Sequence, residues 1–239
     1  MNAPGPIVLV GGSGLGPWAW NRVTPILHQR GLTVITPQLR ATGDDRTAPA
    51  TVTLTDWIND LTADVNRLED VTLVAHSFAG YVAAGALSQV ADRLRSVIFL
   101  DAVLPHPGAS WFEVMGSATE GFMRSIAQDG AIPWWTRDQL DQMYPDNGIT
   151  QTDLAWLHER VTPQPINTYA QPAIDQPIET LAAGVRLHYV KCLRTHPRAA
   201  PITSDTPGWT MSTIDSSHWP MITDPEHTAQ RIIEVVEGA

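Results

Sequence analysis

A run of aliphatic and β-branched residues that ends at a serine constrains this chain more than any other feature. Residues Val71 to His76 predict a buried strand, and a helix-compatible segment from Tyr81 to Val90 follows Ser77 almost at once. A strand, a tight turn with serine at its tip and a helix together form a nucleophile elbow. The alternative is an ordinary strand and helix in which Ser77 caps the helix.

The residues around the serine are small, as such a turn requires. The backbone at its tip is strained, so bulky neighbours would clash. The elbow pattern places glycine two residues before and two residues after the serine. Ala75 and Ala79 occupy these positions here, and Gly80 follows. Alanine is the smallest residue with a Cβ atom, so we expect the turn to tolerate both.

Strand and helix patterns alternate on both sides of this unit. Apolar runs at 7–10, 32–36, 71–76 and 96–100 alternate with helical patterns that include 18–27, a segment capped by Thr53 or Thr55, and 81–90. Strand patterns return at 185–192 and 209–214, and Pro225 begins the last helix. This order predicts an α/β fold with a mostly parallel sheet covered on both faces.

A segment without a convincing strand pattern interrupts the alternation. We predict a helical cap insertion at 104–185 over a core made of 1–103 and 186–239, which suits a length of 239 residues. The insertion is rich in proline and aromatic residues, which either line a pocket or pack the insertion itself. The candidates for substrate contact are Trp111, Trp134, Trp135 and, outside the insertion, Trp219.

The charge balance excludes several classes of partner. Asp and Glu number 25 against 15 Lys and Arg, a net charge of −10, which argues against nucleic acid or an anionic membrane as a partner. The single cysteine, Cys192, permits no intrachain disulfide and argues against a cysteine-based metal site. No pattern of a signal peptide or membrane span is present, so we expect a cytoplasmic protein. We expect no metal and no cofactor.

Candidate catalytic groups follow the carboxyl ends of the predicted strands, where sites form in parallel sheets. They are Ser77, Asp101, His218 and the glycine-rich loop 11–16. Serine is a poor nucleophile unless a base takes its proton, and imidazole is the base suited to neutral pH when a carboxylate fixes its tautomer. The chain order serine, acid, histidine is that of the α/β-hydrolases.

His218 is the best candidate base among eight histidines, because it alone lies between the last strand and the last helix. His76 points to the other side of its strand by alternation, so we expect a packed or hydrogen-bonded core residue. The loop Gly11-Gly12-Ser13 is expected to supply one backbone donor to an oxyanion hole, and the Phe78 N–H the other. The loop lacks the features of a P-loop and of a dinucleotide fingerprint, so nucleotide binding is disfavoured.

These residues resemble the α/β-hydrolase superfamily, and more closely its branch of plant methylesterases and hydroxynitrile lyases with their bacterial esterase relatives. The matching pieces span most of the chain: Val8-Leu9-Val10-Gly11-Gly12, Trp18-x-Trp20, Ala75-His76-Ser77-Phe78-Ala79-Gly80, Phe99-Leu100-Asp101-Ala102, Thr162-Pro163-Gln164-Pro165 and His218. The resemblance implies a hydrolase fold with a cap.

Three departures from that branch matter. The usual His-Gly before the oxyanion loop reads Gly11-Gly12, which removes a side chain but no backbone donor. The branch places its acid after the 187–192 strand, where no carboxylate occurs before Asp205, so we favour Asp101, with Asp205 and then Asp215 as alternatives. The cyanohydrin-cleaving members carry Lys after the histidine and Thr in the oxyanion loop. Trp219 and Gly12-Ser13 stand at those positions here, so the lyase interpretation is weakened.

The resulting hypothesis is a serine esterase acting on a small apolar ester of the methyl ester or lactone type. Ser77, His218 and Asp101 form the triad, and the amides of Ser13 and Phe78, with Gly12 beside them, form the oxyanion hole. A lyase, cyclase or acyl transferase with the same triad is the first alternative, and a catalytically silent ligand-binding relative is the second. The expected partner is a small ester, and whether the chain is a homodimer stays open.

Overall fold

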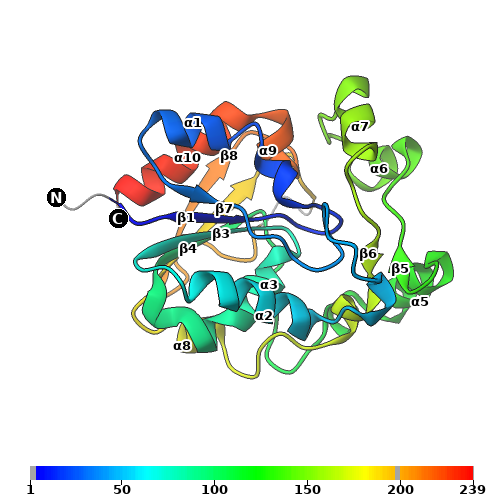
Figure 1. Cartoon of the computed structure of the whole chain (residues 1–239), viewed down its shortest axis with the longest axis horizontal. Helices are drawn as coiled ribbons and strands as arrows, with labels where there is room; N and C mark the ends of the chain where they lie inside the picture. The colour runs from blue at the N-terminus through cyan, green and yellow to red at the C-terminus, as the bar shows by residue number, and fades with distance from the viewer. Residues whose placement is uncertain (1–3, 197–199, 239) are drawn as a thin grey trace.

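Six parallel strands form the centre of the protein, in the order β2-β1-β3-β4-β7-β8 (Figure 1). The computed structural model describes residues 4–196 and 200–238, so the predicted core limits at 1 and 239 lie outside the described residues. The strands of this sheet are β1 (Ile7–Val10), β2 (Val34–Ile35), β3 (Val71–His76), β4 (Leu94–Leu100), β7 (Arg186–Cys192) and β8 (Trp209–Ile214). The predicted parallel α/β sheet is confirmed.

Helices cover both faces of the sheet (Figure 1). One face carries α1 (Thr24–Gln29) and α10 (Pro225–Glu237), with α9 (Pro220–Thr223) beside them, and the other carries α2 (Leu54–Val65), α3 (Ala79–Val90) and α8 (Ile178–Leu181). Alternation along β3 divides the core accordingly. Leu73 and Ala75 pack toward α2 and α3, whereas Val74 packs with the residues of α1 and α10. Every residue of β1 and β3 is buried, which explains why β1 is wholly apolar and β3 is apolar except for Thr72 and His76.

Local signals set several element ends. Thr53 caps α2 in a capping box with Asp56, as one of the two expected caps. The predicted helix over 18–27 is wrong in extent: a 3-10 helix, Pro17–Trp20, precedes the separate helix α1. Pro25 lies in the first turn of α1, where its missing N–H costs nothing, and it favours a new start there. The predicted strand at 32–36 is shortened to β2.

Most of the segment between β4 and β7 lies beyond one end of the sheet, at the right of the view in Figure 1. It holds α4 (Trp111–Met115), α5 (Ser117–Ile126), α6 (Arg137–Met143), α7 (Gln151–His158), β5 (Ala131–Ile132) and β6 (Gln164–Pro165), before α8. The expectation of no strand here is wrong, because β5 and β6 form an antiparallel pair. Two residues are too few to show an alternating pattern in the sequence. None of the described helices is long and apolar enough to span a bilayer.

Candidate active site

Ser77 lies in the turn between β3 and α3. Its φ of +54° is in the left-handed region, which is strained for a residue with a side chain. The Ser77 carbonyl accepts hydrogen bonds from the N–H groups of Gly80 and Val103, both at 3.0 Å. A Cβ atom on Gly80 would overlap the Val103 carbonyl, so this position requires glycine, whereas Ala75 and Ala79 fit without strain of that kind. The local chain therefore holds the serine side chain out of the strand.

His218 lies between β8 and α9, and its ring joins Ser77 to Asp101. The His218 Nδ1 atom is 2.7 Å from Asp101 Oδ2, and Nε2 is 2.9 Å from Ser77 Oγ. A carboxylate only accepts hydrogen bonds, so Nδ1 carries the proton and Nε2 is free to accept the Ser77 hydroxyl. This is the tautomer that a general base requires. The three groups form one continuous hydrogen-bonded chain.

Asp101 follows β4 directly, with a φ of +44°. Its Oδ1 atom accepts from Lys191 Nζ at 3.0 Å and from the Cys192 N–H at 3.2 Å, while Oδ2 accepts from His218. Burial alone would raise the pKa of Asp101, but hydrogen bonding to His218 and the charges of His218 and Lys191 outweigh it. The pKa lies well below its usual range, and the carboxylate stays ionised.

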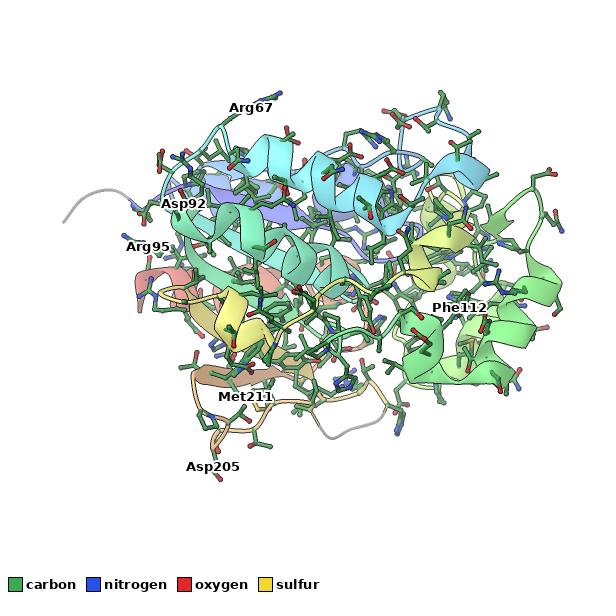
Figure 2. The ribbon with its side chains drawn as sticks, turned by 90° about the horizontal axis from the view of Figure 1, so that it is seen from below. Arg67, Asp92, Arg95, Phe112, Asp205 and Met211 are labelled. Atoms are coloured by element: carbon green, nitrogen blue, oxygen red, sulfur yellow. The ribbon has the colours of Figure 1, made fainter. Side chains whose placement is uncertain are left out.

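The two alternative acids lie away from the His218 ring. Asp205 is exposed and stands at the tip of the loop before β8, as Figure 2 shows. Asp215 is also exposed and pairs with Arg194 at 3.0 Å. Of the three candidates, Asp101 is the one that contacts the imidazole.

His76 is completely buried beneath this site. Its Nε2–H donates to the backbone carbonyl of His218 at 2.6 Å, because a carbonyl can only accept. The sequence predicted a packed or hydrogen-bonded core residue, and its contact with the His218 backbone is the added detail. Burial, reinforced by the charge of His218, lowers the pKa of His76 to about 3, so it is neutral at physiological pH.

The glycine-rich loop after β1 runs against the elbow. A Cβ atom on Gly12 would lie 2.7 Å from Ser77 Cβ, which explains why glycine is needed there. Within the described residues, the backbone N–H groups of Ser13 and Phe78 donate to no protein acceptor. Two free donors flanking a nucleophile are what an oxyanion hole needs.

The segment 162–169 fastens this loop from outside the sheet. Tyr169 Oη and Ser13 Oγ are 2.6 Å apart, the Gly14 N–H donates to Gln164 Oε1 at 3.0 Å, and the Thr162 N–H donates to the Gly14 carbonyl at 3.0 Å. The Thr162-Pro163-Gln164-Pro165 motif thus has a structural role, because the Gln164 side chain accepts the Gly14 N–H of the oxyanion loop in place of a backbone carbonyl.

A pocket of about 780 Å³ opens beside Ser77. Its wall is mostly apolar and aromatic, and the four predicted tryptophans, Trp111, Trp134, Trp135 and Trp219, all line it. Tyr144, at the end of α6, stacks on the His218 ring with centroids 5.1 Å apart and planes 15° apart. Burial raises the pKa of Tyr144 to about 12, so the ring over the imidazole is a neutral phenol.

A sequence model described as the alpha/beta hydrolase family matches residues 7–231. The chain belongs to this family. The predicted resemblance to the superfamily is thereby confirmed. In residues 4–196 and 200–238 of this alpha/beta hydrolase, no group of three or more His, Cys, Asp and Glu side chains is placed to hold a metal ion.

Several relatives of this alpha/beta hydrolase are esterases by name. A carbendazim hydrolyzing esterase from Nocardioides sp. (strain SG-4G) is 26% identical over 240 residues, covering 94% of this chain and 97% of that protein. Methylesterase 2 of Arabidopsis thaliana is 30% identical over 145 residues, covering 59% of this chain and 52% of that protein. A solved methylesterase from Arabidopsis matches 98% of this chain and 100% of its own, with a TM-score of 0.76 and 17% identity.

Sequence reasoning on this hydrolase missed three residues that the fold brings to the site: Tyr144, Tyr169 and Lys191. A signal existed for Lys191, since it is a charged residue near the end of the predicted strand 185–192 and alternates with Leu187 and Tyr189 toward one face. The two tyrosines gave no comparable signal, because their positions depend on how the irregular segment folds. Trp219 follows His218 where the cyanohydrin-cleaving members carry a lysine, and Lys191 lines the pocket from β7 instead.

Proposed function

We propose that the protein is a serine hydrolase that cleaves small, apolar carboxylic esters. The observation that carries this proposal is the hydrogen-bonded chain from Ser77 through His218 to Asp101 beside an aromatic pocket. Relatives named as a carbendazim hydrolyzing esterase and methylesterases support the class of carboxylic ester hydrolase.

In the first half of the reaction, Ser77 Oγ attacks the ester carbonyl carbon. His218 Nε2 takes the hydroxyl proton, and Asp101 stabilises the imidazolium that results. The carbonyl oxygen becomes an oxyanion that the N–H groups of Ser13 and Phe78 bind. Collapse of this intermediate breaks the bond to the alkoxy oxygen, which leaves as an alcohol after taking the proton from His218. The acyl group remains on Ser77.

In the second half, water attacks the acyl carbon and gives its proton to His218. The Ser77 oxygen then leaves and takes that proton back, which releases the acid and restores the enzyme. The same two backbone donors serve both intermediates, so one loop geometry supports both steps.

The pocket favours an uncharged acyl group. Most of its lining side chains are apolar or aromatic, and its four tryptophans offer broad contact to an aromatic or alicyclic group. We propose a methyl ester or lactone as the substrate type, with residues 104–185 acting as a cap over the site.

Substitution of the nucleophile tests the proposal directly. With p-nitrophenyl acetate, Ser77→Ala is expected to lower kcat/KM at least about 10⁴-fold, since the triad acts as a unit. A fluorophosphonate probe is expected to label the Ser77 peptide of the wild type, as read by mass spectrometry. Unchanged hydrolysis in the variant would show that Ser77 is not the nucleophile.

The same experiments separate the alternatives. A lyase, cyclase or acyl transferase would label at Ser77 but would prefer carbon–carbon cleavage or an acceptor other than water. A silent ligand-binding relative would remain unlabelled although folded.

A further inference from the structure

Lys191 brings a buried ammonium group to the wall of the active-site pocket. Its side chain is 5% exposed and pairs with Asp101, which is 1% exposed, at 3.0 Å. An ammonium carries three donors, and Asp101 is its only hydrogen-bond acceptor among the described residues. Two donors are therefore left at the pocket wall, and a buried donor without an acceptor costs free energy.

Thr195 adds a second polar group to the same wall. It lies in the turn that follows β7, four residues after Lys191, and it also lines the pocket. The residue is 7% exposed, and its Oγ1 atom is buried with no hydrogen-bond partner in the part of the chain that the structure describes. Buried hydroxyls in folded proteins are mostly hydrogen-bonded to protein, ordered water or a ligand, so Thr195 has capacity to bind a group that enters the pocket.

Three other hydroxyls on the pocket wall already have hydrogen-bond partners. Tyr169 pairs with Ser13, Tyr189 donates to the Ala102 carbonyl, and Thr119 donates to the Met115 carbonyl. Trp134 Nε1 is also buried without an acceptor in the described residues, but it belongs to the α5–α6 connection rather than to the β7 wall. On the β7 wall, Lys191 and Thr195 are thus the buried side chains with hydrogen-bonding capacity left, and His196 beside them is exposed.

The charge at this point selects the kind of group that fits. Lys191 and Asp101 form a neutral pair, and Asp101 also serves His218. A carboxylate on the ligand would put a second anion beside one buried cation. A neutral oxygen acceptor takes the spare donors without adding charge.

We propose that Lys191 and Thr195 form a specificity subsite for a neutral oxygen acceptor, such as a keto or alkoxy oxygen, in the non-reacting part of the ester. This inference rests on the proposed ester hydrolysis at Ser77. The substrate is then an apolar ester that carries a second oxygen function, and the pocket distinguishes it from a plain alkyl ester of the same shape.

The test uses pairs of esters that differ only by a keto group in place of a methylene group. The keto group is moved along the acyl chain of methyl esters and along the alcohol chain of acetates. At one position, the wild type is expected to favour the keto ester by about tenfold in kcat/KM, because a site with unpaired donors rejects the analogue that lacks the acceptor.

Three variants locate the subsite. Thr195→Val and Lys191→Met are each expected to reduce the keto-to-methylene ratio several-fold. The ratio cancels any general loss that Lys191→Met causes through Asp101. Thr119→Val is the matched control, because it also removes a pocket-lining hydroxyl, but one already bonded to the Met115 carbonyl. It is expected to leave the ratio unchanged.

The outcomes separate this inference from the proposed function. A ratio near one at every position, or a ratio that neither Thr195→Val nor Lys191→Met changes, overturns the subsite. So does a preference for half-esters with a free carboxylate over the keto esters. If the wild type hydrolyses neither the plain esters nor the keto esters, or Ser77→Ala hydrolyses them equally well, it is the proposed function that fails.

Discussion

At the scale of single residues, the proposed nucleophile and acid share one backbone conformation, a positive φ directly after a strand. Ser77 and Asp101 directly follow the neighbouring strands β3 and β4, and both have positive φ values, +54° and +44°. The chain turns sharply at each strand end and presents the side chain at the same edge of the sheet. An aspartate tolerates this conformation better than most residues, so the acid suits its position.

Replacement of Asp101 by asparagine is expected to lower kcat about 10⁴-fold, because the amide no longer fixes the required tautomer of His218. Steady-state kinetics with p-nitrophenyl acetate measures the loss, and circular dichroism checks that the variant is folded. Asp205→Asn and Asp215→Asn serve as controls and are expected to keep wild-type rates. A comparable loss in either control would move the acid away from Asp101.

His76 is expected to make the protein less stable in mild acid. Its pKa falls from 6.5 to about 3 on folding because burial disfavours the charged form. Below pH 6.5 the unfolded chain binds a proton at His76 that the folded chain does not bind. The contribution of His76 to the free energy of unfolding is therefore complete above pH 6.5 and is lost as the pH falls toward 3. The slope is about 1.4 kcal/mol per pH unit.

Urea unfolding between about pH 7 and pH 5 measures this slope. In His76→Gln the free energy of unfolding is expected to depend less steeply on pH, while the exposed control His106→Gln retains the wild-type slope. Equal slopes in the wild type and His76→Gln would contradict the assignment.

At the scale of elements, the two glycines Gly80 and Gly121 lie in helices but differ in surroundings. A Cβ atom on Gly80 would collide with the Val103 carbonyl, whereas one on Gly121 in α5 would meet nothing within 4 Å. Gly80→Ala is expected to lower the free energy of unfolding by more than about 2 kcal/mol. Gly121→Ala is expected to raise it by about 0.5–1 kcal/mol, since alanine loses less chain entropy in a helix. Urea titrations compare the two variants. A Gly80→Ala protein of normal stability would show that the turn after Ser77 does not require glycine at this position.

The oxyanion loop is expected to depend on its anchor in segment 162–169. Tyr169→Phe removes the hydrogen bond to Ser13, so kcat should fall about 3- to 10-fold with a smaller change in KM. Ser13→Ala should have the same effect, and the double variant should lose no more than either one. Tyr81→Phe is the control, because the buried Tyr81 hydroxyl has no partner among the described residues. Additive losses would mean that the two side chains act separately.

At the scale of the whole molecule, residues 104–185 and the sheet are joined at the site. The three hydrogen bonds from 162–169 to Ser13 and Gly14, and the stacking of Tyr144 on His218, cross between them. We expect both parts to unfold in one transition. Tryptophan fluorescence, which includes Trp111 and Trp134, and far-UV circular dichroism should give the same urea midpoint. Two separate midpoints would show that the segment is independently stable.

The sequence predicted the sheet well because its signals are local. Long apolar runs such as 71–76 define strands buried on both faces, and serine, aspartate and histidine each follow such a run. Parallel packing then brings strand ends together, so the placement of Ser77, Asp101 and His218 at one edge follows from topology.

The pocket wall could not be predicted in the same way. The contacts of Tyr144 and Tyr169 depend on short helices and a two-residue strand pair, whose patterns are too brief to read. Lys191 stood in a recognised strand, but its pairing with Asp101 depends on the register between β4 and β7. The register between two strands cannot be predicted from the sequence of either strand alone.

The position of the proposed acid, Asp101, directly after β4 has a practical consequence for protein engineering. On the proposed mechanism, the turn after β7 carries no member of the proton relay, although Thr195 lines the pocket from it. Residues 193–196 can then be randomised in a library without dismantling the chemistry at Ser77. A scaffold arranged this way can change its substrate preference through one short turn while the groups of the proposed relay stay in place.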